Sequence, residues 1–438
     1  MKQTAERIFR DTLAAIDIPA AMERKLAPLG SSICSNDAAI DLREFETILA
    51  IAYGKASFAM AEGLSRILAP DFPVEGILVA PNAQPFDLAG WEVFTGGHPV
   101  PNAASFAAGR AILDRLAKCD ERTLIFFLIS GGGSSLVEQP LDPSSTLADF
   151  VRLHAALVTC GAPIGEINAV RKHVSATKGG RLAAAAPRSM KLTLAISDVP
   201  QGQESALASG PTLPDPTTVG DAMQVAEKYK LTERLSPSLG AILEYQGMLE
   251  TPKAGEPAFA RSRFILLLRG HDLTHAAHHA CEAEGYVSLI DKSTDNWPVE
   301  KAADYLLGVL EDQKAQNPGR AVALLTDGEL SSPVSGNGVG GRNSAFVLSC
   351  VSKIAGRNIT VLSAGTDGID GNSPAAGAVA DGETLARARG AGLDPGDFMS
   401  RSDAYGFFSR LGDAVVTGPT GNNLRDLRIL LARPAMES

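Results

Sequence analysis

The feature that most constrains the fold is an apolar run that ends abruptly in glycine and serine, at residues 124–136 (LIFFLISGGGSSL). Such a run is typical of a strand buried on both faces of a parallel sheet, and strands of this kind end in ligand-binding loops. Glycines allow backbone N–H groups to approach an anion, and serine hydroxyls are further donors. The pattern predicts a phosphate or carboxylate site, with a plain tight turn as the alternative interpretation. The candidate residues are Ser130, Gly131, Gly132, Gly133, Ser134 and Ser135.

Short apolar strands alternate with helices along most of the chain, which predicts an α/β fold with a parallel sheet. Residues 47–68 show the repeating unit, with a strand, a glycine, Lys55 and then a helix. Residues 248–262 are rich in proline, glycine and charge, and they are the candidate interdomain linker. We therefore expect one domain over residues 1–247 and another over residues 263–438.

Composition excludes several classes of function. The net charge of −10 argues against nucleic-acid binding through a basic surface. The five cysteines lack CxxC or paired spacing, which fits a reducing compartment better than a disulfide framework. Neither a signal peptide nor a membrane-spanning run is recognisable, so we expect a cytoplasmic protein without a membrane partner. The expected partner is a small molecule, and a homodimer is compatible with the sequence.

Charged residues are found where strands give way to loops. Lys55 follows a strand and a glycine, so it either meets a ligand or begins a solvated helix. Asp198, Asp367 and Asp370 also follow expected strands, where carboxylates are often functional. Asp198 and Asp367 are candidate Mg²⁺ ligands, because this ion binds through one or two carboxylates plus substrate phosphate. Asp370 is equally well explained as a turn former. One basic segment contains Arg171, Lys172, His173, Lys178 and Arg181.

Residues 336–343 contain the spacing G-x-G-x-x-G, which is the dinucleotide-binding fingerprint. The context is not that of a dinucleotide site, because no acidic residue lies between Arg342 and Thr366 and the preceding strand ends well before the loop. We interpret this segment as a loop that brings Arg342 and a helix N-terminus to an anion. The Walker A pattern and the G-x-S-x-G pattern of serine hydrolases are absent.

Four histidines lie close together within residues 271–279. His271 and His275 have the spacing of metal ligands on a helix, but Asp272 stands where the HExxH motif has glutamate. The sequence therefore favours a solvated helix face at this position, with a metal site as the alternative.

Taken together, these stretches resemble the class II glycerate kinases, the family whose C-terminal part is called the MOFRL domain. The matching segments keep their order and span almost the whole chain. They are AYGKAS, GGHPVPN, LISGGGSSL, INAVRKHVSATKGGRLA, ISDVP, LASGPT, GVGGRNSA, SAGTDGIDGNSPAAGAV and VTGPTGNN. The resemblance implies a Rossmann-like parallel-sheet domain followed by a smaller α/β MOFRL domain, with the active-site cleft between them.

The resemblance also implies an activity. An enzyme of this family uses ATP and Mg²⁺ to phosphorylate D-glycerate, usually at the 2-hydroxyl, which gives 2-phosphoglycerate and ADP. It implies catalytic roles for Lys55, Asp198 and Arg342 of this sequence. Phosphoryl transfer requires charge neutralisation and alignment more than covalent chemistry, so a site of glycine amides, cations and carboxylates suits it.

Under this hypothesis, substrate and metal have separate candidate residues. His98 and either Arg171 or Lys172 would bind the substrate, and one of the two cations would hold its carboxylate. Asp367 and Glu329 would support the Mg²⁺ ion.

Three segments depart from the family pattern. Residues 200–204 (PQGQE) replace a Gly-Asp-Asp type run, residues 326–329 (TDGE) replace TGGE, and residues 420–423 (TGNN) replace TGTN. Three alternatives stay open as a result. The alternatives to a D-glycerate kinase are a kinase for another short hydroxy acid, a hydroxypyruvate reductase, and a non-catalytic sugar-acid-binding protein. The missing dinucleotide context argues against the reductase.

Overall fold

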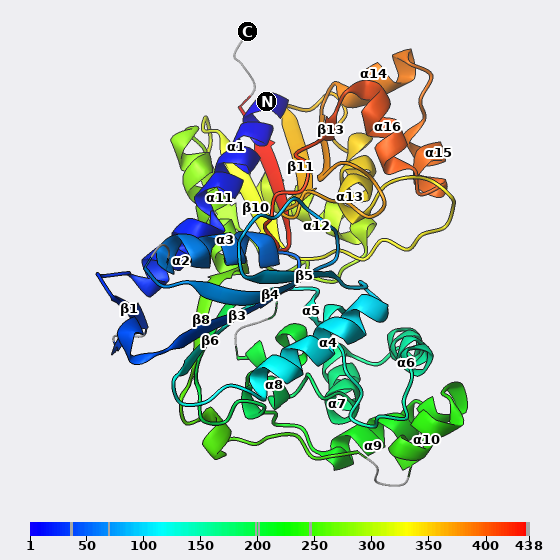
Figure 1. Cartoon of the computed structure of the whole chain (residues 1–438). Coiled ribbons are helices and arrows are strands. Elements are labelled where there is room, and N and C mark those ends of the chain that lie inside the picture. The colour runs from blue at the N-terminus through cyan, green and yellow to red at the C-terminus, as the bar shows by residue number, and fades with distance from the viewer. Residues whose placement is uncertain (36–37, 69–70, 198, 200–201, 245–247, 435–438) are drawn as a thin grey trace. The chain divides into compact units, whose positions relative to one another are not determined.

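The computed structural model describes residues 1–35, 38–68, 71–197, 199, 202–244 and 248–434 (Figure 1). The chain divides into two compact units, one of which is Ile18–Leu267. The other unit joins Met1–Asp17 to Leu268–Ser438. We call these the larger unit and the smaller unit.

The larger unit is built on a six-stranded sheet with the order β5-β4-β3-β6-β7-β8. The strand β3 runs parallel to β4 and β6, β4 runs parallel to β5, and β6 runs parallel to β7. Numbered along the chain, this is the order 3-2-1-4-5-6 of doubly wound nucleotide-binding folds, in which ligands bind where the order reverses. Here that point lies between β3 and β6. The strands are β3 (Thr47–Tyr53), β4 (Val74–Ala80), β5 (Trp91–Thr95), β6 (Thr123–Ile129), β7 (Met190–Ser197) and β8 (Ser262–Arg269).

The apolar run that dominates the sequence is the central strand β6, and all of its residues are buried. It is buried on both faces because α3 (Ser57–Leu68) and α4 (Ala103–Leu116) cover opposite faces of the sheet (Figure 1). The prediction of a parallel α/β sheet is therefore confirmed. A side chain of Asn102 caps α4, which fixes where this helix begins after the loop that follows β5.

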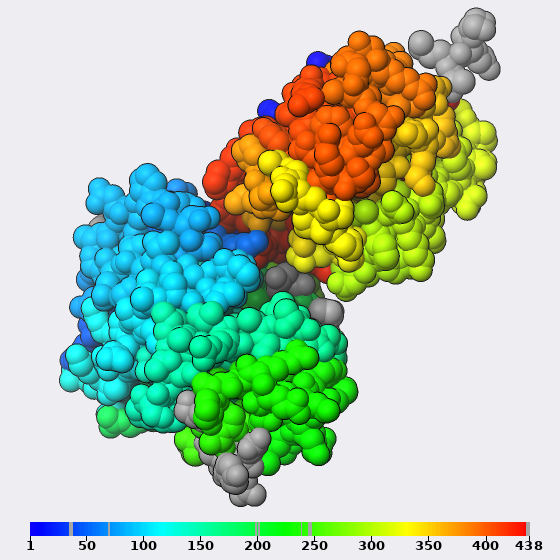
Figure 2. Space-filling view, turned by 90° about the vertical axis from the view of Figure 1, so that its right-hand side faces the viewer, coloured from blue at the N-terminus to red at the C-terminus, as the bar shows by residue number. Residues whose placement is uncertain are grey.

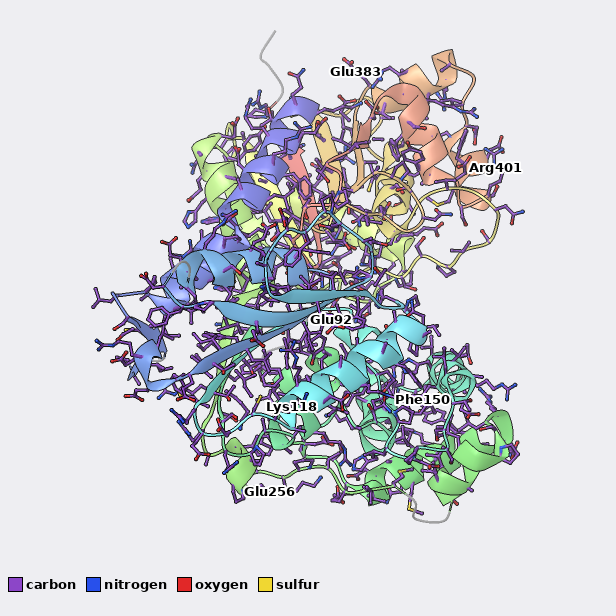
Figure 3. All side chains as sticks on the ribbon, viewed as in Figure 1. Glu92, Lys118, Phe150, Glu256, Glu383 and Arg401 are labelled. Carbon is purple, nitrogen blue, oxygen red and sulfur yellow. The ribbon has the colours of Figure 1, made fainter. Side chains whose placement is uncertain are left out.

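A second core of the larger unit lies mainly among four helices. Phe150 belongs to this core and is labelled in Figure 3. The four helices are α6 (Leu147–Thr159), α7 (Ile164–Val174), α9 (Val219–Lys228) and α10 (Pro237–Glu244). In the space-filling view their surfaces adjoin one another, from the teal of α6 to the green of α10 (Figure 2). This helical layer supplies one wall of the site described below.

The smaller unit contains a mixed six-stranded sheet with the order β13-β12-β11-β14-β10-β9. The strands β9 and β10 run parallel, and the other strand pairs of this sheet are antiparallel in the described part of the chain. The strands are β9 (Val287–Ile290), β10 (Val322–Asp327), β11 (Ile359–Gly365), β12 (Gly377–Asp381), β13 (Ala414–Val415) and β14 (Asp426–Ala432). The larger helices are α11 (Gly270–Ala283), α12 (Val299–Gln316) and α13 (Arg342–Val351). Three short helices follow: α14 (Thr384–Gly390), α15 (Pro395–Ser400) and α16 (Ala404–Leu411).

The opening helix α1 (Lys2–Ala15) packs in the smaller unit, against α11 and the strands β11, β12 and β14 (Figure 1). It buries Ala5, Ile8 and Phe9, and Lys2 Nζ donates to Asp413 Oδ2 at 2.7 Å. The predicted domain boundary differs from the two units at this helix. The prediction placed α1 in the N-terminal domain, whereas Met1–Asp17 belongs to the smaller unit. The helix is amphipathic, and the partner of its apolar face is chosen by long-range packing that the local pattern does not encode.

The predicted linker also differs from the structure. Thr251 Oγ1 donates to Asp215 Oδ2 at 3.0 Å, Asp215 N–H donates to Pro252 O at 3.1 Å, and Ala258 is buried. Residues 248–262 therefore pack within the larger unit.

The larger unit begins with α2 (Ile18–Leu26) and a two-stranded ribbon of β1 (Ser32–Ser35) and β2 (Ala38–Asp41). None of the helices in the described part of the chain combines the length and apolarity that a membrane span requires.

Candidate active site

Two loops meet at the point where the strand order of the larger unit reverses. Lys55 follows β3, and the glycine loop follows β6. Lys55 N–H donates to Gly131 O at 3.1 Å, and Ala56 N–H donates to Ser130 Oγ at 3.0 Å. Ser130 is fully buried, and its own N–H donates to Tyr53 O at 3.2 Å. The two predicted loops are therefore one hydrogen-bonded structure, and the hydroxyl of Ser130 helps to join them.

Gly54 permits this close approach. Its φ is +123°, and a Cβ at this position would lie 2.2 Å from Ser130 Oγ and 2.6 Å from Ser130 O. We expect Gly54→Ala to lower the free energy of unfolding by about 1–3 kcal/mol or more, since strain and overpacking each have this size. Urea unfolding measures the loss. The matched control is Gly165→Ala in α7, where a Cβ meets nothing within 4 Å and should stabilise the helix by about 0.5–1 kcal/mol. Equal stabilities for the two variants would contradict the prediction.

Gly132 and Gly133 of the glycine loop are needed for different structural reasons. Gly132 has φ +81° and precedes the short helix α5 (Gly133–Leu136). A Cβ on Gly132 would lie 3.4 Å from Lys55 Cγ and 3.3 Å from His98 Cε1, so these two side chains flank it. A Cβ on Gly133 would lie 3.0 Å from both Tyr53 and Ala208, so this glycine serves packing.

A pocket of about 260 Å³ lies beside the loop, entirely within the larger unit. Ordinary small-molecule sites have volumes of about 300–1,000 Å³, so this pocket is of a size for a small ligand. Backbone of Gly131 and Gly132 lines it. The polar side chains that line it are His98, Ser134, Ser135, His154, Asn168, Arg171 and Ser209.

Hydroxyl and amide groups form one wall of this pocket. Ser134 Oγ and Ser209 Oγ are hydrogen-bonded at 2.8 Å, and Ser209 Oγ donates to Asn168 Oδ1 at 3.0 Å. His98 Nδ1 and Ser135 Oγ are hydrogen-bonded at 3.2 Å. Burial, followed by the charge of Lys55, lowers the pKa of His98 below its usual value. His98 therefore meets a ligand as a neutral imidazole at neutral pH.

Arg171 is the cation of the pocket. It extends from α7, and its Nη2 lies 3.4 Å from His154 Nδ1 on α6. Burial lowers the pKa of Arg171, but a guanidinium stays charged at neutral pH. Its Nε is buried and makes no hydrogen bond to the described residues, and the side chain as a whole lines the pocket.

The structure separates the two alternative carboxylate-binding residues, Arg171 and Lys172. Successive helix residues point about 100° apart, so Lys172 leaves α7 on another side. Its Nζ is buried and donates to Asp215 Oδ1 at 2.9 Å. Lys172 is not among the residues that line the pocket and forms a buried ion pair with Asp215, whereas Arg171 lines the pocket.

A buried charged pair behind the pocket was not predicted. Lys178 Nζ donates to Glu138 Oε2 at 2.9 Å, and both side chains are 1 % exposed. Ser175 Oγ also donates to Glu138, and His154 Nε2 lies 3.6 Å from it. Although burial opposes the charge, Lys178 and then His154 hold the pKa of Glu138 at about 2. The Glu138 carboxylate of this pair thus lies next to the imidazole of His154, which lines the pocket.

Sequence reasoning also missed Asn168 and Ser209 as pocket residues. Both lie in segments that carry the family resemblance, INAVRKH and LASGPT. The motifs therefore marked these positions, but they did not indicate that the two side chains line a pocket. His154 lies on α6 outside any such segment, and the sequence holds no signal for it. Asp198, the predicted catalytic aspartate, lies outside the described residues.

The smaller unit holds the second group of predicted residues. Arg342 is the first residue of α13, and it donates to Glu329 Oε2 at 2.8 Å and to Asp426. Burial works against the charge of Arg342, but Asp426 and then Glu329 raise its pKa overall. Asp367 and Asp426 lie close together where β11 ends and β14 begins. A Cβ on Gly365 would lie 3.0 Å from Asp367 Oδ1 and 3.4 Å from Asp426 Oδ1.

The predicted metal pair is only partly assembled. Glu329 is an ion-pair partner of Arg342, and Asp367 Oδ1 accepts from Ile369 N–H at 3.1 Å. Among the described residues, neither belongs to a set of three ligand atoms that lie within 4.8 Å of one another. The carboxylate oxygens of these two residues are nevertheless the ligand type that Mg²⁺ prefers.

Asp370 has a role that neither interpretation of the sequence gave it. It accepts from Asn343 N–H at 2.9 Å, Ser344 N–H at 2.8 Å and Ser344 Oγ at 2.6 Å, so it caps the start of α13 from a distant loop. Burial raises the pKa of Asp370. A Cβ on Gly341 would lie 2.3 Å from Asp370 Oδ1, so the glycine-rich loop is needed for this cap, and the cap fixes the direction in which Arg342 leaves the helix.

Comparisons with known proteins place the chain in a family. A family model described as a domain of unknown function (DUF4147) matches residues 4–244, and the MOFRL family model matches residues 322–426. The D-glycerate 2-kinase of Thermotoga maritima is 33% identical over 88% of this chain and 90% of its own length. A relative from Agrobacterium vitis that carries a provisional hydroxypyruvate reductase name is 35% identical over 98% of this chain and 94% of its own.

The crystal structure of a Thermotoga maritima glycerate kinase matches this fold with a TM-score of 0.84 at 30% identity. The match covers 98% of this chain and 99% of that chain. The resemblance that the sequence motifs carried is confirmed, and the chain belongs to the class II glycerate kinases, the kinase family with a C-terminal MOFRL domain.

Proposed function

We propose that this protein transfers a phosphoryl group from ATP to the 2-hydroxyl of D-glycerate, which gives 2-phosphoglycerate and ADP. The observation that carries the proposal is the pocket of the larger unit, which combines glycine amides, hydroxyls and the Arg171 guanidinium around a volume suited to a three-carbon acid. Relatives named glycerate 2-kinase support the same substrate.

In this proposal the pocket holds the acid. Arg171 binds the carboxylate, because its side chain lines the pocket and its guanidinium is charged. The hydroxyls of Ser134 and Ser209, with Asn168, bind the hydroxyl groups of the acid. These groups orient the substrate hydroxyl for attack, since alignment supplies a large part of catalysis in phosphoryl transfer.

Charge on the transferring phosphoryl group is met by cations. In the larger unit, the amide groups of Gly131 and Gly132 and the ammonium of Lys55 bind its oxygens. Arg342 of the smaller unit stays a proposed catalytic residue. Asp367 and Glu329 would hold Mg²⁺, which neutralises phosphate charge when it is bound. Asp198 stays the proposed group that orients or deprotonates the attacking hydroxyl.

A reductase is less favoured by the loop after β3. In dinucleotide-binding folds the first strand leads into G-x-G-x-x-G, whereas β3 leads into Gly54, Lys55 and the tight contact with Ser130. A pyrophosphate has no glycine-rich turn to approach at this strand.

The deciding experiment is coupled ADP release with ATP, Mg²⁺ and D-glycerate, with phosphorus NMR of the product. The 2-phosphate resonance of the product is the expected result. Turnover only on another short hydroxy acid would keep the kinase and change the substrate. Folded protein without turnover on any acid, or NADH oxidation with hydroxypyruvate, would overturn the proposal in favour of a binding protein or a reductase.

A further inference from the structure

Four of the seven histidines of the chain lie on one helix, α11. His271, His275 and His279 follow one another at intervals of four residues, which places them on one face, and all three are exposed. The rings of His271 and His275 are 4.1 Å apart between centroids. The phosphoryl-transfer site needs none of these side chains.

The possible metal ligands that the structure brings together differ from His271 and His275, the pair with metal-ligand spacing in the sequence. His278, His279 and Glu282 each present one ligand atom, and the three atoms lie within 4.8 Å of one another. His278 Nε2 lies 3.5 Å from Glu282 Oε1, and His279 Nδ1 lies 3.5 Å from Glu282 Oε2. In a tetrahedral zinc site with bonds of about 2.0–2.2 Å, neighbouring ligand atoms are about 3.4 Å apart. Each imidazole nitrogen lies at about that distance from the carboxylate of Glu282, although from a different one of its two oxygens.

A partner outside the set fixes the orientation of one ligand. His278 Nδ1 is hydrogen-bonded to Ser288 Oγ of β9. When Nδ1 carries the proton, Nε2 presents its lone pair toward Glu282. Metal-binding histidines are held in this way, with the second ring nitrogen bonded to a neighbouring polar group.

We propose that the last two turns of α11 bind one divalent transition-metal cation, of which Zn²⁺ is the representative. His278 Nε2, His279 Nδ1 and the carboxylate of Glu282 are the ligands, and water fills the fourth position. Imidazole nitrogens suit zinc, copper and nickel, whereas Mg²⁺ prefers oxygen ligands only, so this site and the phosphate-bound metal select different ions. A bound ion stabilises the end of α11 and, through Ser288, its contact with β9.

The test is calorimetric titration of ZnCl₂ into the tag-free full chain without nucleotide, together with thermal unfolding. We expect one site per chain and a rise in the melting temperature. The pair His278→Ala and His279→Ala should abolish both effects. Ser288→Ala should weaken binding by about 10- to 100-fold, as the loss of an orienting partner does in metal sites.

The matched control is His271→Ala, an exposed histidine of the same helix outside the set of three. It should bind Zn²⁺ as the parent chain does. With Co²⁺ as the probe, the parent chain should show the visible absorption of a four-coordinate ion, and the double variant should not. Absence of a zinc site, or equal binding by the parent chain and the double variant, would overturn the proposal, as would loss of binding in His271→Ala.

Discussion

Lys55→Ala is expected to lower kcat by about 100- to 1000-fold, the effect of removing one preorganised group that stabilises charge in a transition state. The side chain lies over Gly132 at the loop that lines the pocket, and its charge is strong enough there to lower the pKa of His98. Steady-state kinetics with ATP and D-glycerate measures the loss. The fold should persist, because the hydrogen bond from this residue to Gly131 uses its backbone N–H, which alanine keeps.

The pKa of His98 is a second measurement on this variant, and it reports on the lost charge of Lys55. Since the Lys55 cation lowers the pKa of His98, that pKa should rise in Lys55→Ala, which an NMR titration of the imidazole follows. The control is Lys118→Ala, an exposed lysine beyond the end of α4 (Figure 3), which should leave kcat unchanged. Unchanged turnover in Lys55→Ala would remove this lysine from the mechanism.

Lys178→Ala is expected to destabilise the larger unit by about 3–5 kcal/mol, because it leaves the carboxylate of Glu138 buried without its ammonium partner. Urea unfolding gives the free energy. The control is Arg115→Ala, which breaks the exposed pair with Glu75 at 2.6 Å and should cost less than about 1 kcal/mol. The double variant Glu138→Gln with Lys178→Met should lose less than the sum of the single changes, since no buried charge is then left alone.

The pH dependence of the same pair has a definite sign. The pKa of Glu138 is about 2 in the folded chain and near 4.5 ordinarily, so the folded state binds its proton more weakly than the unfolded state does. The stabilisation it supplies is present above about pH 4.5 and is lost as the pH falls toward 2. Acid unfolding of Glu138→Gln should therefore lack this part of the pH dependence. Equal slopes for the parent chain and Glu138→Gln over this interval would contradict the assignment, as would an Arg115→Ala loss equal to that of Lys178→Ala.

The larger unit could be predicted from its sequence because its signals are local. The buried strand β6 reads as an apolar run, and the glycine loop after it is a short-range pattern. The strand β12 cannot be predicted from local sequence, because its residues, GAVAD, are small and have little strand propensity of their own. It forms by pairing with β11 and β13, which are distant contacts that no window of sequence reveals.

The candidate site could be predicted only in part, for the same reason. Arg171 and Lys172 are neighbours in a basic segment, and only the helix register separates the pocket residue from the ion pair with Asp215. Glu138 and His154 carry no local pattern, because they come from separate segments that packing brings together. Asp370 could be recognised as a turn residue, but its capping of α13 depends on a loop far along the chain.

The placement of α1 has a consequence for the order in which the chain folds. This helix is synthesised before the larger unit, yet the surfaces that cover Ile8 and Phe9 belong to elements made only after the whole of Ile18–Leu267. The larger unit has all of its own strands by then, so it can complete its core early, while α1 keeps an uncovered apolar face until α11 and β14 are made. A fragment that starts at Leu268 would lack this helix and expose the apolar surface that it covers, so the smaller unit is better isolated with Met1–Asp17 joined to its other end.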